Sequence, residues 1–297
     1  MEHAAFEAAR EALVTARREA RAIGAWPAHW QPADVDEACR LQAAVAAGLG
    51  TIGGWKIAAV TEAQRAALGV TRPLGAPVLA AWLRGAHDAA ATAPMDAPIA
   101  HFRVRDFIVP KLECEFAFEL AHDLPPRPGQ PYTRGEVEAA TGAMRLAIEI
   151  VDSRLPHGSG ALAELADGFN NGALVCGPAV AQWQSLAFGQ IGIRLHASHG
   201  GESSSTELAL GSGAAILDGD PFGTVVMLAN VPSEPGVGLR AGQIVTTGSC
   251  TGAPALPGPG FYRAEFAGLG SVSVRETPSR FRRSAARSPS ALRSARA

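Results

Sequence analysis

Two glutamates on one face of a predicted strand are the side chains of this sequence best placed to do chemistry. In the segment 111–118, Glu113 and Glu115 alternate with large apolar residues, which is typical of a β-strand with one buried face. Residues two apart on such a face are separated by roughly 6.5–7 Å. Two carboxylates at that spacing repel each other unless a hard cation lies between them. The alternative is a half-buried strand whose acidic face is solvated, and the strand pattern alone favours it.

Glu149 is a third acid with unusual surroundings, because it stands in a run of Ile and Val within the segment 145–154. A bare carboxylate is too costly to bury there, so it must be paired, protonated or bound to a metal ion. Pairing with Arg145 or Arg154 is the structural alternative, and Asp152 is an acid that could serve in place of Glu149. Three carboxylates favour Mg²⁺, Mn²⁺ or Ca²⁺ over zinc, because hard oxygen ligands suit hard cations.

Lys56 is the cation expected near these acids. It lies between Trp55 and Ile57 in an apolar segment that is predicted to be a strand, 51–60. A lysine in such a strand costs energy unless its ammonium group meets an anion or leaves the core. It is therefore either a partner of the acidic residues or an edge lysine that extends to solvent.

The elements that position these residues suggest an α+β protein. Apolar periodicity and capping signals predict helices at 3–22, 34–49, 61–69, 133–144, 162–166 and 221–230. Alternating apolar residues predict further strands at 173–176, 191–198, 203–210, 244–249, 261–266 and 271–275. We expect a helical segment at 1–50, a catalytic domain at 51–275 and a disordered tail rich in Arg, Ser and Ala at 276–297.

Composition excludes several classes of function. The formal net charge of -2 gives no general attraction to nucleic acid or membranes, and no run of 18 apolar residues predicts a membrane span. The N-terminal residues lack the pattern of a secretory signal. The four cysteines are far apart, which argues against zinc and disulfides and fits the cytoplasm. The chain has no P-loop and no Gly-x-Ser-x-Gly motif, and neither Gly211-Ser212-Gly213 nor the His196/His199 pair is a convincing site.

Five segments in order carry a family resemblance. They are Gly54-Trp55-Lys56-Ile57, Lys111–Phe118, Ala147–Arg154, Val245-Thr246-Thr247-Gly248-Ser249 and Ala264–Val272. Together they resemble the 2-keto-4-pentenoate hydratase / 4-oxalocrotonate decarboxylase group of the fumarylacetoacetate hydrolase superfamily. The resemblance covers roughly residues 30–275.

This resemblance implies a fold and a site. It implies a mixed β-roll or β-sandwich of the fumarylacetoacetate hydrolase C-terminal type, an N-terminal helical segment and a homo-oligomer. It implies Mg²⁺ or Mn²⁺ held by the acids already singled out, with Lys56 near the substrate. The substrate carboxylate would be held by the loop Thr247-Gly248-Ser249. From the turn 167–171 we expect Asp167 to take part in catalysis and Asn171 to bind substrate.

The expected function is that of a divalent-metal-dependent lyase, a hydratase of acids like 2-hydroxypenta-2,4-dienoate in aromatic-compound catabolism. Alternatives are a decarboxylase of the 4-oxalocrotonate type, a C–C hydrolase of the acylpyruvate or fumarylacetoacetate type, and a non-catalytic 2-oxo acid binding protein. The chain departs from the family pattern in two places. No acid follows Leu68-Gly69-Val70, and the family's Ala-Asp-Asn-x-Ser turn reads Ala-Asp-Gly-Phe-Asn-Asn at 166–171.

Overall fold

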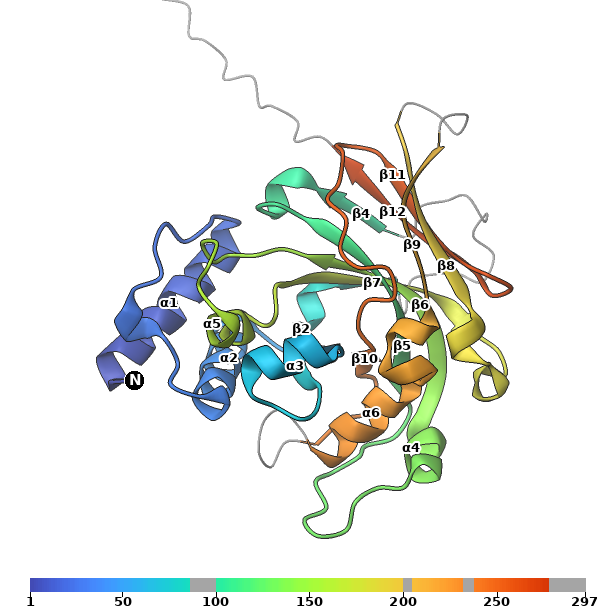
Figure 1. The fold of residues 1–297 in the computed structure, drawn as a ribbon, viewed down its shortest axis with the longest axis horizontal. Coiled ribbons are helices and arrows are strands. Elements are labelled where there is room, and N and C mark those ends of the chain that lie inside the picture. The colour runs from blue at the N-terminus through green and yellow to red at the C-terminus, as the bar shows by residue number, and fades with distance from the viewer. Residues whose placement is uncertain (86–99, 200–204, 232–237, 278–297) are drawn as a thin grey trace, which may run out of the picture.

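The computed structural model describes residues 1–85, 100–199, 205–231 and 238–277. It combines two mixed β-sheets with helices that pack around them (Figure 1). The predicted tail at 276–297 falls almost entirely outside the described residues, and only its first two residues belong to the last strand.

The larger sheet carries the segments that contain the acids. Its seven strands follow the order β2-β1-β10-β5-β6-β7-β3. Their bounds are β1 Ile52–Ala58, β2 Leu74–Leu79, β3 Leu83–Arg84, β5 Lys111–Leu120, β6 Thr141–Val151, β7 Asn171–Val180 and β10 Ile244–Thr246. β1 pairs in parallel with β10 and β3 with β7, while the other neighbours are antiparallel. Lys56 of β1 is thereby brought into the same sheet as the glutamates of β5 and β6.

The smaller sheet has five strands in the order β4-β12-β11-β8-β9. Their bounds are β4 Ala100–Arg103, β8 Gly192–Ser198, β9 Ser205–Ser212, β11 Phe261–Phe266 and β12 Gly270–Thr277. Phe116 of β5 meets Phe266 of β11 with ring centroids 5.4 Å apart, so the apolar face of β5 packs against the smaller sheet. The opposite face of β5, which carries Glu113 and Glu115, is left for the site.

In the described part of the chain, six α-helices surround the sheets: α1 His3–Glu19, α2 Val35–Leu49, α3 Glu62–Leu68, α4 Arg134–Ala140, α5 Ala161–Ala166 and α6 Pro221–Asn230. Asp34 caps α2 by accepting from Glu37 N, and Thr61 and Thr133 form capping boxes on α3 and α4. The first two helices pack on α5 through an apolar cluster, which includes Leu13, Leu41 and Ala163. Figure 1 shows α1, α2 and α5 grouped together on one side of the sheets. Among the described helices, none combines the length and apolar character that crossing a membrane requires.

Several predicted boundaries were wrong: for example, α1 ends at Glu19 and not at 22, and two further cases change the element to which residues belong. The helix expected to reach Met144 ends at Ala140, because residues 141–144 join β6 and pair with β5. Met144 is fully buried opposite Phe118, so sheet pairing outweighs the helical start signal at Thr133. The strand expected at 173 begins at Asn171, which moves Asn171 from the turn onto β7.

Candidate metal centre

The three glutamates singled out in the sequence meet on one face of the larger sheet. Glu113 of β5 and Glu149 of β6 are register partners across the antiparallel pair, and Glu115 follows two residues along the same face. Each of the three offers one carboxylate oxygen, and these oxygens lie within 4.8 Å of one another. We call Glu113, Glu115, Glu149 and the adjacent Lys56 the acidic cluster.

Two of these carboxylates are completely buried and only half satisfied. Glu115 Oε2 accepts from Gly248 N at 3.0 Å, and Glu149 Oε1 accepts from Asn171 Nδ2 at 3.0 Å. The second oxygen of each group, Glu115 Oε1 and Glu149 Oε2, has no hydrogen-bond partner among the residues that the structure describes. Buried carboxylate oxygens without a donor are costly, and a hard divalent cation is the partner that suits several at once. The donor set therefore fits Mg²⁺, Mn²⁺ or Ca²⁺.

Lys56 supplies one positive charge to this cluster. Its Nζ lies 3.2 Å from Glu149 Oε1 and donates to the carbonyl of Phe169 at 2.9 Å. Burial would lower the pKa of Lys56, but the three glutamates outweigh it and raise that pKa above its usual value. Burial also raises the pKa of Glu113 to about 7 and that of Glu115 well above its ordinary range. The single positive charge of Lys56 thus does not balance the charges of three carboxylates.

A cavity of about 840 Å³ opens beside the acidic cluster. Lys56 and Glu113 line it, together with Gly248, Ser249 and Asn170. Apolar side chains complete the wall, among them Ile57, Val60, Leu68 and Phe169. A small acid with a hydrocarbon chain fits such a mixed lining.

The predicted substrate loop is divided between the cavity and the core. Gly248 and Ser249 line the cavity, whereas Thr247 is fully buried and its hydroxyl donates to the carbonyl of Phe116. Gly248 has a φ of +98°, and a Cβ there would meet Val60 at 2.8 Å, so only glycine brings its amide to Glu115.

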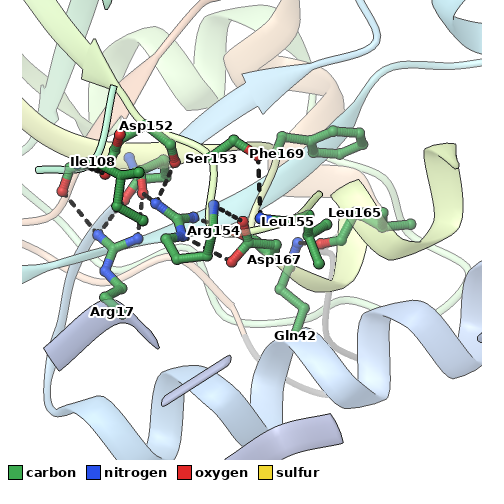
Figure 2. Close-up of polar contacts among 12 residues, drawn as sticks. Arg17, Gln42, Ile108, Asp152, Ser153, Arg154, Leu155, Leu165, Asp167 and Phe169 are labelled. Carbon is green, nitrogen blue, oxygen red and sulfur yellow. Dashed lines mark hydrogen bonds and ion pairs between the residues drawn. The ribbon is translucent and has the colours of Figure 1, made fainter. Parts of the chain in front are cut away.

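Asp167 is paired with Arg154 and is not among the residues that line the cavity beside the acidic cluster. Arg154 Nε donates to Asp167 Oδ1 at 2.9 Å, and both side chains are buried away from the cavity (Figure 2). Arg154 also donates to the carbonyl of Asp167 at 2.7 Å. A carboxylate held in this way ties Arg154 to the turn 167–171, and the catalytic role expected of Asp167 from the sequence stays a prediction.

The alternatives for the buried acids are also decided. Arg145 pairs with Glu119 at 2.7 Å and Arg154 with Asp167, so neither arginine is the partner of Glu149. Asp152 accepts from the backbone N–H groups of Ile108 and Val109 at 2.9 and 2.7 Å. Both of its oxygens therefore have donors, and it does not take the place of Glu149.

Asn170 and Arg17 lie near the site and were not predicted from the sequence, and Asn171 lies in a different place from the one expected. Asn170 lines the cavity with a φ of +60°, and its buried Oδ1 has no partner. Asn171, expected to bind substrate, does not line this cavity and donates instead to Glu149. Behind it, Arg17 of α1 donates to the backbone carbonyl of Asn171. The Asn-Asn pair was a visible signal for Asn170, whereas no local signal marks Arg17. We call Arg17, Arg154, Asp167 and Asn171 the arginine cluster.

Comparison with known proteins places this arrangement in a family. No family model matches the chain. It is 30% identical over 225 residues to a 2-keto-4-pentenoate hydratase of Burkholderia vietnamiensis, covering 75% of this chain and 78% of the relative. It is 32% identical over 170 residues to a 4-oxalocrotonate decarboxylase of Pseudomonas sp. strain CF600, where the match covers 57% of this chain and spans only 60% of the relative.

Solved structures show the same fold. The 4-oxalocrotonate decarboxylase of Pseudomonas putida G7, solved with magnesium and adipate, superposes with a TM-score of 0.75 at 23% identity, over 93% of this chain and 99% of that one. A fumarylacetoacetate hydrolase family protein of Yersinia pestis CO92 gives a TM-score of 0.50 at 15% identity, over 76% and 94% of the chains. The chain belongs to the family of the 2-keto-4-pentenoate hydratases, and it shares its fold with the decarboxylase and with the fumarylacetoacetate hydrolase family protein.

Proposed function

We propose that this chain is a divalent-metal-dependent lyase that hydrates 2-hydroxypenta-2,4-dienoate or a similar 2-oxo-4-enoic acid. The observation that carries the proposal is the pair of buried, unpartnered oxygens on Glu115 and Glu149, beside Lys56 and at the edge of a cavity. The kinship with proteins named 2-keto-4-pentenoate hydratase supplies the substrate class.

Glu113, Glu115 and Glu149 are the residues that we assign to Mg²⁺ or Mn²⁺. When bound, the ion supplies Lewis-acid charge that stabilises an enolate on the substrate. The amide of Gly248 donates to one oxygen of Glu115, and the side-chain amide of Asn171 donates to one oxygen of Glu149. The other oxygen of each carboxylate is left free. The two donors thus keep the carboxylates oriented without competing for the free oxygens.

Lys56 is the residue that we assign to proton transfer. Its ammonium is fixed between Glu149 Oε1 and the carbonyl of Phe169, and it lines the cavity. From there it can give a proton to the substrate carbon while the hydroxyl proton of the dienol leaves to solvent, and solvent returns a proton to the lysine, so the dienol becomes the ketone without net gain or loss of protons. The Gly248 amide donates to Glu115, and the Ser249 hydroxyl donates to the carbonyl of Gly252 at 3.0 Å. We assign the substrate carboxylate to the Ser249 hydroxyl, which lines the cavity and can rotate away from Gly252 to donate to it.

A second candidate function is decarboxylation of a 4-oxalocrotonate-type acid. Lys111 lines the same cavity, and its side chain makes no hydrogen bond or ion pair with any residue in the described part of the chain. A second cation at the cavity suits a substrate with a second carboxylate. The acids and Lys56 would serve both reactions, because each passes through an enolate.

Turnover assays with both substrates test the proposal. Metal-stripped protein is supplied with Mg²⁺ and either 2-hydroxypenta-2,4-dienoate or 4-oxalocrotonate, and loss of ultraviolet absorbance and release of CO₂ are recorded. We expect Mg²⁺-dependent absorbance loss with the dienoate and no CO₂. Release of CO₂ from the dicarboxylate would favour the second candidate. Tight binding of 2-oxo acids without turnover of either would overturn both and indicate a binding protein.

From the same kinship we also propose the assembly, the cellular location and the domain division of the protein. The chain would form a homo-oligomer and act in the cytoplasm on products of aromatic-ring cleavage, with residues 1–50 as a helical segment and 51–275 as a β-roll catalytic domain. Light scattering of the purified protein tests the assembly. A mass equal to one chain, 30.6 kDa, would contradict it.

A further inference from the structure

Arg17 is a half-buried arginine far in sequence from the residues it contacts. It lies near the end of α1 and donates to the carbonyl of Asn171, to Asn171 Oδ1 at 3.1 Å and to the carbonyl of Gly172 at 2.8 Å. Figure 2 shows its side chain extending from the helix toward the segment that contains Arg154. All three of its acceptors are neutral oxygens.

This burial is costly for a positive charge. Transfer of a guanidinium out of water is normally compensated by a carboxylate, and Arg17 has none within hydrogen-bond distance in the described part of the chain. Arg154, a second cation, donates to the same carbonyl of Asn171 at 2.8 Å. Stabilisation by an ion pair therefore does not account for Arg17, and another role is needed.

Arginine determines which way the amide of Asn171 points. A guanidinium has donors and no acceptor, so the atom of Asn171 that faces Arg17 must be Oδ1. The amide nitrogen then faces Glu149 and donates to Oε1 at 3.0 Å. Lys56 lies 3.2 Å from the same Oε1, so this oxygen is occupied twice while Oε2 has no partner.

We propose that Arg17 is a positioning residue for the acidic cluster, which acts through Asn171 to orient Glu149 so that Oε2 stays free for a divalent cation. The inference rests on the proposed metal site. It makes the N-terminal helix a part of the site, because α1 supplies the side chain that fixes the donor to Glu149. Interactions of this kind behind a metal ligand change metal affinity by about 10- to 100-fold.

Metal affinity tests the proposal without any need for turnover. Full-length protein is stripped with EDTA, and Mn²⁺ is titrated by calorimetry into wild type, Arg17→Gln and Arg18→Gln. Arg18 is the matched control, since it lies next along α1, is exposed and donates only to the carbonyl of Gly48. We expect Arg17→Gln to weaken Mn²⁺ binding at least about tenfold and Arg18→Gln to leave it unchanged.

A double-mutant cycle separates positioning from a general loss of stability. In an Asn171→Ala background, Arg17→Gln should have almost no further effect on Mn²⁺ affinity, because the connecting amide is already gone. Additive losses would overturn the proposal, as would equal affinities of wild type and Arg17→Gln. Should Arg17→Gln fail to fold by circular dichroism, Arg17→Lys replaces it with the same expectation, since lysine keeps the charge but cannot contact both Asn171 oxygens and Gly172. Failure of wild type to bind Mn²⁺ would instead refute the metal site itself.

Discussion

The acidic cluster and the arginine cluster meet where Asn171 of the second donates to Glu149 of the first, and they satisfy their charges in opposite ways. In the arginine cluster, Asp167 accepts from the side chain and backbone of Arg154, whose guanidinium also donates to backbone carbonyls. In the acidic cluster, two fully buried carboxylate oxygens have no donor, and one lysine faces three acids. Each cluster is buried except for one half-buried member, Glu113 in the first and Arg17 in the second, so burial alone does not distinguish them.

The difference shows how a buried charge can be assigned to structure or to chemistry. A polar network whose donors and acceptors are all paired has no free group to bind a ligand. Its removal lowers the free energy of unfolding. A network with buried, unpaired polar groups costs free energy in the ligand-free protein, and a bound ligand that pairs with those groups removes this cost. On this basis we assign the arginine cluster to support of the turn 167–171 and the acidic cluster to metal binding.

The largest expected effect is on turnover, through Lys56. Lys56→Met removes the proposed proton donor while the three carboxylates stay in place, so we expect kcat to fall by about 10²- to 10⁴-fold. Mn²⁺ binding should persist, because the variant loses a competing positive charge. Absorbance assays and Mn²⁺ titration measure the two effects. Unchanged kcat would remove Lys56 from the mechanism.

Asp167→Asn tests whether the arginine cluster is structural. The variant breaks a buried ion pair and leaves Arg154 without its anion, so the free energy of unfolding should fall by about 3–5 kcal/mol. Urea denaturation in EDTA measures the change. Asp106→Asn, which breaks the partly exposed pair with Arg103, is the matched control and should cost at most about 1 kcal/mol. Loss of turnover at unchanged stability would restore the catalytic role for Asp167.

The pH dependence of metal binding follows from Glu113. Burial raises its pKa to about 7, so below that pH the metal-free protein carries a proton that the ion must displace. Mn²⁺ affinity should rise up to about tenfold per unit between pH 6 and 7, and it should keep rising above pH 7 because the raised pKa of Glu115 gives the ion a second proton to displace. In the metal-free protein, the stabilising contribution of this raised pKa is present below the unfolded-state pKa and is lost as pH rises through about 7. Titrations at pH 6, 7 and 8 that give equal affinities would contradict this account.

The smallest effect is expected at a site remote from both clusters. Thr133→Ala removes the capping box of α4, where the hydroxyl accepts from Glu136 N, and should cost about 1 kcal/mol. Thermal unfolding measures this cost. Mn²⁺ affinity should not change, and a change would mean that the acidic cluster responds to stability in general.

The sequence predicted the contents of the acidic cluster better than its surroundings. Alternation placed Glu113 and Glu115 on one face, and the apolar run around Glu149 marked a carboxylate that needed a partner. The register that sets Glu113 opposite Glu149 depends on strand pairing, which a single sequence does not encode locally.

The second layer behind the cluster could not be predicted in the same way. Asp167 and Asn171 belong to a polar turn, and turn composition does not reveal which side chains face a cavity and which face the core. Arg17 is one of several arginines in an amphipathic helix, and its partner lies 154 residues away in sequence. Only the packing of α1 against α2 and α5 brings the two together.

Titration of Mn²⁺ into metal-stripped wild type and Glu149→Gln tests the central claim most directly. The substitution keeps the size of the side chain and removes its charge. We predict that wild type binds one ion per chain at the acidic cluster and that Glu149→Gln loses this binding while it remains folded. An absence of binding by wild type, or equal binding by the two proteins, would contradict the assignment of the acidic cluster to a metal ion.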